Sequence, residues 1–209
     1  MEALTDAGAA TATSRFIHRT GIAAGGDPRM CSLEEALAYR NDQILFKFQE
    51  RWNVSFEEAA ELFEETKKWL WLQVAARLRP DAPPLAMTVS LAIVDEMLHT
   101  FILFTREYIQ YCDEHYGVYL HHAPMTKKDK DAKLAWFKSA PDQMLAHESE
   151  FLSNMYSFTY ELLGEETVVR WYSEYPKKYS GMRMAELTRT DGRRFALVEV
   201  DAEEDAAAA

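Results

Sequence analysis

Apolar residues recur every three or four positions through most of this chain, which is the spacing of amphipathic helices. The first such stretch follows Ser32, and Glu35 three positions later completes a capping box. This pattern predicts a helix over residues 33–52. A second box of the same kind, beginning at Ser55, opens a helix over residues 55–79, and the prolines of RPDAPP cannot continue it.

The middle of the chain predicts three further helices. One runs over residues 88–116 and ends at Gly117, a residue that tolerates the left-handed conformation on which helices often end. We expect a loop over residues 117–133, in which the mixed charges of KKDKDAK form a solvated turn. A helix over residues 141–163 ends on a second glycine, and a shorter helix covers residues 165–179.

The two ends of the chain differ in pattern from its centre. Asp191-Gly192 separates two strand-like segments, a combination that favours a type I′ hairpin turn. The predicted fold is therefore an all-α, single-domain bundle of about five helices with a small C-terminal β-hairpin. Its predicted divisions are a flexible arm over residues 1–31, a helical domain over 32–181, a hairpin or extended segment over 182–200 and a disordered tail over 201–209.

Composition narrows the class of protein. A chain of 209 residues with 48% hydrophobic residues can bury a substantial core. The 23 basic and 34 acidic residues give a net charge of -11, which disfavours general binding to nucleic acid. We find no apolar block of signal-peptide or membrane-spanning length, and therefore expect no secretion and no membrane contact. Two cysteines, Cys31 and Cys112, are too few for a disulfide scaffold and predict a cytoplasmic location.

Candidate chemistry concentrates in residues 95–124, which hold four of the six histidines. At 100° per residue, His99 falls about 40° and Arg106 about 20° from Asp95, so the three form one polar stripe on the helix over 88–116. Apolar residues cover more than half of that helix, which predicts a central position in the bundle. A narrow polar stripe on a central helix is expected to face an internal cleft.

Asp95 and His99, one helical turn apart, can ligate one cation together. His121 and His122 supply further ligands if the loop after Gly117 folds back along the helix. An aspartate with two or three histidines suits zinc, or iron in a two-histidine, one-carboxylate arrangement.

Neighbouring residues offer further roles and further exclusions. Glu96 is the nearest candidate for a general base, and Arg106 could hold an anionic group of a substrate. Cys112 lies on the apolar face of the predicted helix, where we expect a buried thiol. No glycine-rich phosphate loop and no Gly-x-Ser-x-Gly motif occurs, so nucleotide chemistry and serine hydrolysis are not supported.

The residues quoted above also resemble a known family. The order Asp95, His99, Cys112, Gly117 and then His121-His122-Ala123-Pro124 is similar to the glycine-rich-domain-containing-protein-like family of plant proteins and shorter bacterial ones. The resemblance implies that the aspartate and the three histidines belong to one constellation. It implies no reaction.

This resemblance extends over roughly residues 33–180. RWNVSFEEAAELFEETKKWLWL at 51–72 and WYSEYPKKY at 171–179 also resemble the bacterial members. Two features depart from the family pattern: Leu98 stands where tryptophan is frequent, and the glycine-rich region is absent from a chain with only eight glycines.

Two hypotheses for function stay open at this point. In the first, the chain is a metal-binding protein, or a metalloenzyme, with zinc or iron held between the helix and the histidine loop. In the second, it is a non-catalytic interaction module in which the same residues fix the loop to the helix through hydrogen bonds. The partner is accordingly a small molecule or another protein.

Overall fold

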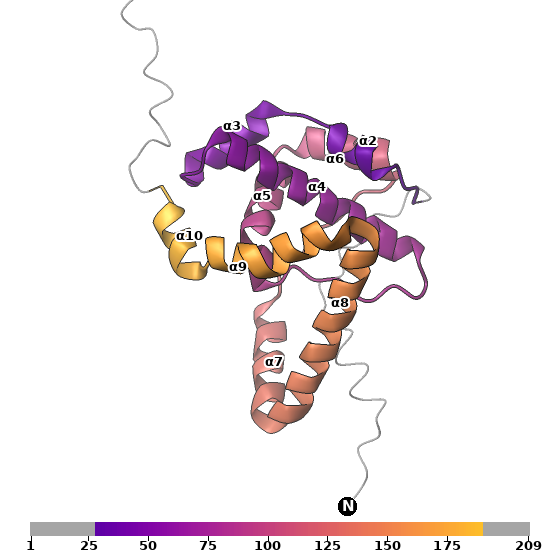
Figure 1. The fold of residues 1–209 in the computed structure, drawn as a ribbon, viewed down its shortest axis with the longest axis vertical. Helices are drawn as coiled ribbons and strands as arrows, with labels where there is room; N and C mark the ends of the chain where they lie inside the picture. Colours follow the sequence, from indigo (N-terminus) through magenta and orange to yellow (C-terminus); the bar gives the residue numbers. More distant parts are fainter. Residues whose placement is uncertain (1–27, 190–209) are drawn as a thin grey trace, which may run out of the picture.

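The structure, a computed structural model, describes residues 28–189, and these residues confirm the all-α prediction. They form more helices than the five predicted, and no strand occurs within this range. The helices are α2 (Leu33–Ala38), α3 (Asp42–Arg51), α4 (Phe56–Leu78), the 3-10 turn η1 (Val89–Leu91), α5 (Ala92–Leu103), α6 (Thr105–Tyr116), α7 (Lys127–Ser139), α8 (Pro141–Val169), the π-helical turn η2 (Arg170–Glu174), α9 (Tyr175–Lys178) and α10 (Gly181–Leu187) (Figure 1).

The first predicted helix is two helices, so the single helix over residues 33–52 is wrong. α3 has its own N-cap at Asn41, whose side chain accepts a hydrogen bond from the Gln43 amide. The end of α2 is held by Lys67 of α4, whose Nζ donates to the carbonyls of Leu37 and Tyr39 at 2.7 and 2.8 Å. A local cap and a long-range donor together stabilise the break.

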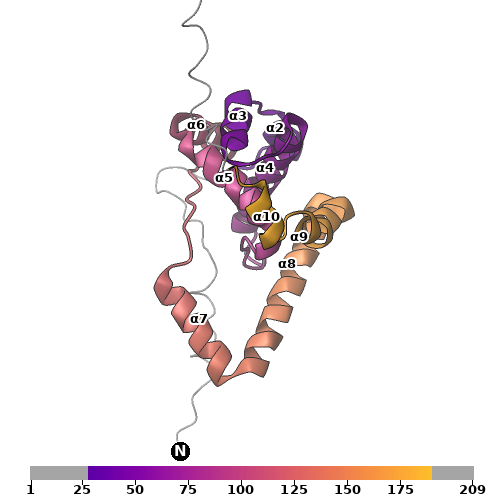
Figure 2. The same cartoon turned by 90° about the vertical axis from the view of Figure 1, so that its left-hand side faces the viewer.

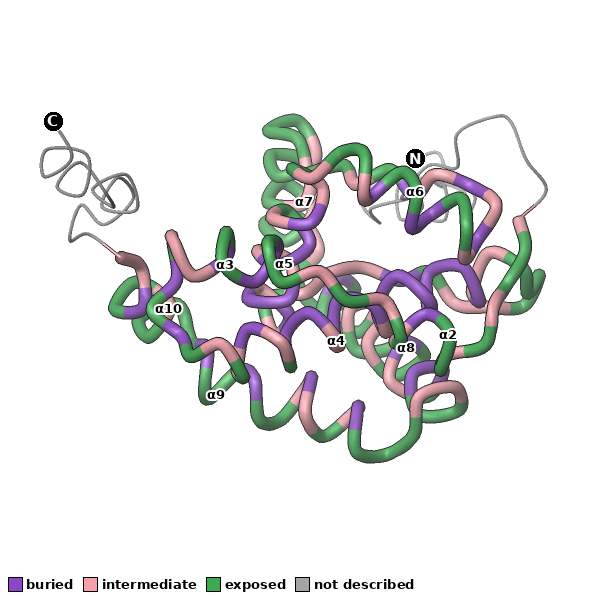
Figure 3. Tube along the Cα trace, turned by 90° about the horizontal axis from the view of Figure 1, so that it is seen from above, coloured by how far each residue is buried: buried purple, intermediate pink, exposed green. Residues whose placement is uncertain are grey.

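The predicted helix over residues 88–116 also divides, at Phe104, whose φ of -83° and ψ of 65° are not helical. α4 and α5 pack together at the centre, and α4 also contacts α2, α3 and α8. Much of α4 is buried along its length (Figure 3). α6 lies beside α2 instead, where Tyr111 donates to the Ala36 carbonyl at 3.2 Å. The prediction of one central helix therefore holds only for its α5 half.

The predicted loop over residues 117–133 is wrong from residue 127 onward, because α7 begins there. KKDKDAK is therefore helical and not a solvated turn. Thr126 and Asp129 form a capping box, in which each side chain satisfies a backbone amide of the other. α7 and α8 diverge from their junction as two arms below the helical body (Figure 2). None of the residues of α7 is buried, whereas Met155 and Phe158 of α8 belong to the core.

α8 continues past the end predicted at residue 163. Gly164, with φ 81° and ψ 172°, makes a kink, and this conformation strongly favours glycine. The chain then passes into η2, where Arg170 and Trp171 both donate to Glu65 at 2.6 Å. Residues 165–179 thus continue α8 beyond a bend and contact α4 through Glu65.

The prediction of a C-terminal hairpin is wrong for residues 182–189. Residues 181–187 form α10, capped by the Ser180 side chain, and only an isolated bridge joins Thr188 to Trp52. The turn at Asp191 and Gly192 lies outside the described residues, as do the tail over 201–209 and most of the arm over 1–31. Arg29 and Cys31, at the end of that arm, donate backbone hydrogen bonds to Tyr116 and His115.

None of the helices between residues 28 and 189 combines the length with the apolar character that a membrane crossing requires.

Candidate metal centre

The segment after α6 carries a histidine back to α5. Gly117 ends α6 in the left-handed conformation, with φ 66° and ψ 5°, and the chain then reverses in an extended form. Val118 and Leu120 are buried, while Tyr119 lies on the alternate side. The Tyr108 hydroxyl donates to the Leu120 carbonyl at 2.7 Å and holds the segment against α6.

This alternation decides which histidine of the pair reaches α5. Side chains of an extended chain point to opposite sides in turn, so His122 shares the inward side of Val118 and Leu120. The His122 side chain is 16% exposed. His121 is exposed, and its ring packs edge-on against Tyr119 with 4.7 Å between ring centroids.

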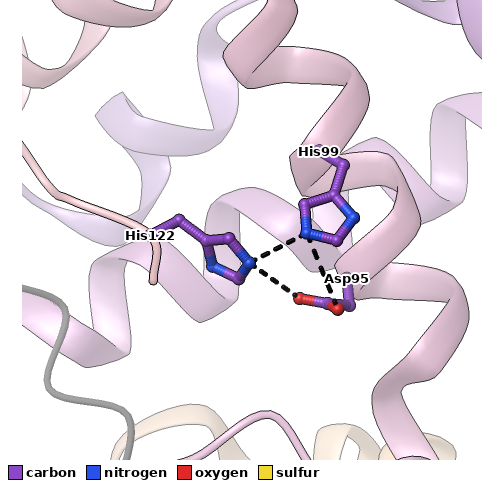
Figure 4. A group of neighbouring side chains, drawn as sticks. All are labelled: Asp95, His99 and His122. Atoms are coloured by element: carbon purple, nitrogen blue, oxygen red, sulfur yellow. Dashed lines mark hydrogen bonds and ion pairs between the residues drawn. The ribbon is translucent and has the colours of Figure 1, made fainter. Parts of the chain in front are cut away.

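Three side chains converge at this point: Asp95 and His99 from α5, and His122 from the returning segment (Figure 4). His99 Nε2 lies 2.9 Å from His122 Nε2 and 3.9 Å from Asp95 Oδ2. His122 Nε2 lies 3.5 Å from Asp95 Oδ1. One nitrogen or oxygen from each residue can be chosen so that all three lie within 4.8 Å of one another.

The hydrogen bonding inside this cluster is incomplete. The contact between the two Nε2 atoms requires one imidazole to donate and the other to accept, which assigns opposite tautomers to the two rings. Asp95 Oδ1 is buried and accepts no hydrogen bond from the residues described here, although His122 Nε2 is 3.5 Å away. A buried carboxylate oxygen of this kind is unfavourable unless a cation or a donor reaches it.

A cavity of about 150 Å³ adjoins the cluster and is lined in part by all three of its residues. Its other walls come from Trp69 and Gln73 of α4, from Ala86 and Met87, and from residues 123–125. Trp69 and Gln73 carry no signal in the sequence, because they follow the ordinary helical period of α4. Their position is set by the packing of α4 against α5.

The two other predicted site residues lie apart from the cluster. Glu96 forms an ion pair with Arg51 of α3, 2.9 Å between Glu96 Oε2 and Arg51 Nη1. Arg106 is exposed on α6, beyond the break at Phe104, and the helical wheel that placed it with Asp95 does not apply across that break. Neither residue is among those that line the cavity in the described part of the chain. Both roles stay predictions.

Cys112 is fully buried in the core, and burial raises the pKa of its thiol to about 11. The thiol therefore stays protonated at neutral pH, and Cys112 is not among the described residues that converge on the cluster.

The cluster offers the chemistry of a small cation site. Two imidazoles and one carboxylate are the ligands used by zinc and by non-haem iron, and three protein ligands leave coordination positions for water or another molecule. Neutral imidazoles bind a cation through a nitrogen lone pair. One of the two Nε2 atoms now carries the proton of the hydrogen bond, so binding through both Nε2 atoms would replace that contact and leave this ring protonated at Nδ1 instead.

A family model described as UCP032817-like matches residues 41–147 of the chain. The match includes α3 to α7, the cluster and the start of α8. No curated protein and no solved structure matches the chain. The resemblance to the glycine-rich-domain-containing-protein-like family is wrong, because the matching family is a different one and its description names no reaction or ligand.

Proposed function

This chain belongs to the UCP032817-like family, and we propose that it is a metal-binding helical protein whose divalent ion is held by Asp95, His99 and His122. The observation that carries the proposal is the close approach of the candidate ligand atoms: 2.9 Å between the two Nε2 atoms, 3.5 Å from His122 Nε2 to Asp95 Oδ1, and 3.9 Å from His99 Nε2 to Asp95 Oδ2. Ligands at about 2.0–2.1 Å from a tetrahedral zinc lie roughly 3.3 Å apart. One ligand atom from each residue already lies within 4.8 Å of the other two, so side-chain movements alone would bring the set to this spacing.

The buried oxygen of Asp95 supports the same proposal. Its carboxylate contributes a charge that partly offsets a divalent cation, and the bound cation supplies the partner that Oδ1 lacks. Zinc and iron(II) are the ions that this ligand set favours. His121 is not included, because its ring packs against Tyr119 on the outward side.

A metalloenzyme is the extension of this proposal. An ion held by three protein ligands would keep open coordination positions, and the adjoining cavity would give it access to a water that acts as nucleophile or to a substrate oxygen that it polarises. Glu96 is paired with Arg51, so its role as a base would require that ion pair to open.

One observation favours the alternative, a non-catalytic interaction module. The 2.9 Å contact between His99 and His122 already links the returning segment to α5 without a cation. In this case the cluster fixes the loop, and added metal changes neither stability nor structure.

Zinc titration with a matched pair of variants tests the proposal. His122→Ala removes one ligand, whereas His121→Ala removes the adjacent, outward histidine. We expect His122→Ala to weaken zinc binding about 100-fold or more, and His121→Ala to weaken it by about twofold or less. Competition against a chromophoric chelator measures both. Wild-type protein that binds no zinc, iron or manganese, or equal losses in the two variants, would contradict the proposal.

A cytoplasmic location and a small-molecule or protein partner belong to the same proposal. The location is supported by Cys31 and Cys112, neither of which forms a disulfide.

A further inference from the structure

A second cavity, of about 420 Å³, lies beside the cluster between the two arms of the structure. It is walled by Met87 and Val89 before α5, by Trp136 of α7, and by Phe151, Leu152 and Tyr156 of α8. α7 and α8 diverge from their junction in Figure 2, and this cavity occupies part of the space between them. Its size and apolar walls are those of a site for a small organic molecule.

The second cavity adjoins the first. Ala86, Met87 and Met125 line both of them, so these three residues lie at the boundary between the larger cavity and the cavity at Asp95, His99 and His122. Two of the three are methionines, whose unbranched side chains change rotamer easily. A molecule can therefore lie in the larger cavity and reach the cluster with one end.

Polar groups in the wall of the larger cavity are few. Lys133 and Glu148 form an ion pair with each other, which leaves little net charge there. His147 Nδ1 is buried, and no hydrogen-bond partner for it occurs among the described residues. The hydroxyls of Thr88 and Ser90, which also line the cavity, hydrogen-bond to each other, and Tyr156 adds a third hydroxyl. The wall therefore suits a largely apolar body with a few polar contacts, among them His147.

We infer that the two cavities together bind an amphipathic small molecule, with an anionic oxygen head at the metal centre and an apolar body in the cavity between α7 and α8. The inference rests on the proposed function, because the bound cation supplies the attraction for the head. The apolar body supplies affinity through the hydrophobic surface that it buries against Trp136, Phe151 and Leu152.

Two hydroxamates test this inference on the full chain loaded with zinc. Acetohydroxamate carries only the chelating head, and octanohydroxamate adds six methylenes that the larger cavity can bury. Each buried methylene strengthens binding about fourfold, so we expect octanohydroxamate to bind about 30-fold more tightly or better, allowing for incomplete burial. Calorimetric titration measures both affinities.

Two variants on one helix locate the tail. Leu152→Trp fills the larger cavity and is expected to remove most of the difference between the two hydroxamates, whereas Leu145→Trp, at a position 58% exposed on α8, leaves it unchanged. Trp136→Phe gives an independent measure. Phenylalanine keeps an aromatic wall but removes the tryptophan at this position, so the part of the tryptophan fluorescence change that depends on the tail should disappear.

The outcomes separate the two proposals. Zinc binding with equal affinities for the two hydroxamates, or equal behaviour of the two tryptophan variants, overturns the inference and leaves the metal centre standing. Absence of zinc binding overturns the proposed function and the role of the head. In that case the affinities of 1-butanol and 1-octanol for metal-free protein decide whether the larger cavity accepts an apolar body. Equal affinities for the two alcohols overturn the binding of an apolar body as well.

Discussion

Two carboxylates on neighbouring helices of this fold have opposite surroundings. Glu65 of α4 is 2% exposed, and its two oxygens receive hydrogen bonds from Arg170 and Trp171 at 2.6 Å and from Lys68 at 2.8 Å. The side chain of Asp95 of α5 is 30% exposed, adjoins a cavity and has one buried oxygen that accepts no hydrogen bond from residues 28–189.

The different surroundings of Glu65 and Asp95 indicate a structural role for the first carboxylate and a ligand-binding role for the second. A buried charge with several well-placed donors holds elements together, and here it ties η2 to α4. A carboxylate with an unsatisfied oxygen beside two imidazoles, at the wall of a cavity, still has capacity for a ligand. We therefore expect changes at Glu65 to alter stability, and changes at Asp95 to alter metal affinity.

The largest expected effect is on stability, at Glu65. Glu65→Ala leaves the buried Nε1 of Trp171 and the guanidinium of Arg170 without their acceptor. We expect the free energy of unfolding to fall by about 3 kcal/mol, measured by urea denaturation of metal-free protein. Under conditions in which Glu65→Ala is folded, it should bind zinc with the same stoichiometry as the wild type. A loss of less than about 1 kcal/mol would show that the pairing does not hold η2.

Asp95 should give the reverse result. Asp95→Asn keeps the size of the side chain and removes its charge, and we expect zinc affinity to fall about 100-fold while the stability of metal-free protein changes by about 1 kcal/mol or less. Asp113→Asn makes the same change at an exposed position of α6 and serves as the control. Equal zinc affinities of the two variants would remove Asp95 from the centre.

Lys67 of α4 is a third charged group and, like Glu65, it is buried and hydrogen-bonded. Its burial predicts that the stability of the protein depends on pH. Its side chain is fully buried, and burial lowers its pKa to about 8 from the usual 10.5, with Arg40 acting in the same direction and Glu64 opposing. Between pH 8 and 10 the unfolded chain therefore binds more protons at this position than the native protein does. Stability attributable to Lys67 should rise with pH across this window.

Comparison with Lys67→Met isolates that effect. From pH 8 to pH 10 the unfolding free energy of the wild type should rise by about 2 kcal/mol relative to the variant, because the ionisation of tyrosines in this range affects both proteins equally and cancels. Lys47→Met, at an exposed position of α3, should follow the wild type. Parallel curves for wild type and Lys67→Met would show that the pKa of this lysine is close to normal.

The smallest effect is expected at the hydrogen bond that supports the histidine segment. Tyr108→Phe removes the donor to the buried Leu120 carbonyl, and we expect a loss of about 1–2 kcal/mol in the free energy of unfolding. Zinc affinity should fall by about tenfold or less, because His122 is still present but less firmly placed. Tyr119→Phe, on the outward side, is the control. Equal stabilities would show that this bond does not fix the segment.

Local signals in the sequence identified the helical class and the starts of α2, α4 and α8. Ser32 and Ser55 cap α2 and α4, and Gly117 ends α6, as their residue types predict. Thr126 and Asp129 carry the same kind of signal for α7, beside mixed charges that by themselves favour a solvated turn. The break at Phe104 carries no such signal, since neither proline nor glycine occurs between residues 85 and 116.

The candidate site shows the same limit. The spacing of Asp95 and His99 was enough to place both on one face of α5, and the pair of histidines indicated a returning loop. Which histidine points inward depends on the burial of Val118 and Leu120, a matter of tertiary packing. Arg106 falls on the same stripe only in an unbroken helix, and Phe104 interrupts that helix. The cavity between α7 and α8 depends wholly on how the two arms pack.

The position of a bound zinc ion tests the central claim most directly. Crystals grown with zinc should give an anomalous difference peak, at the zinc absorption edge, about 2.0–2.2 Å from a carboxylate oxygen of Asp95 and from Nε2 of His99 and His122. The two Nε2 atoms should then lie farther apart than the present 2.9 Å. A zinc peak elsewhere, or no peak together with an unchanged contact between His99 and His122, would contradict the account.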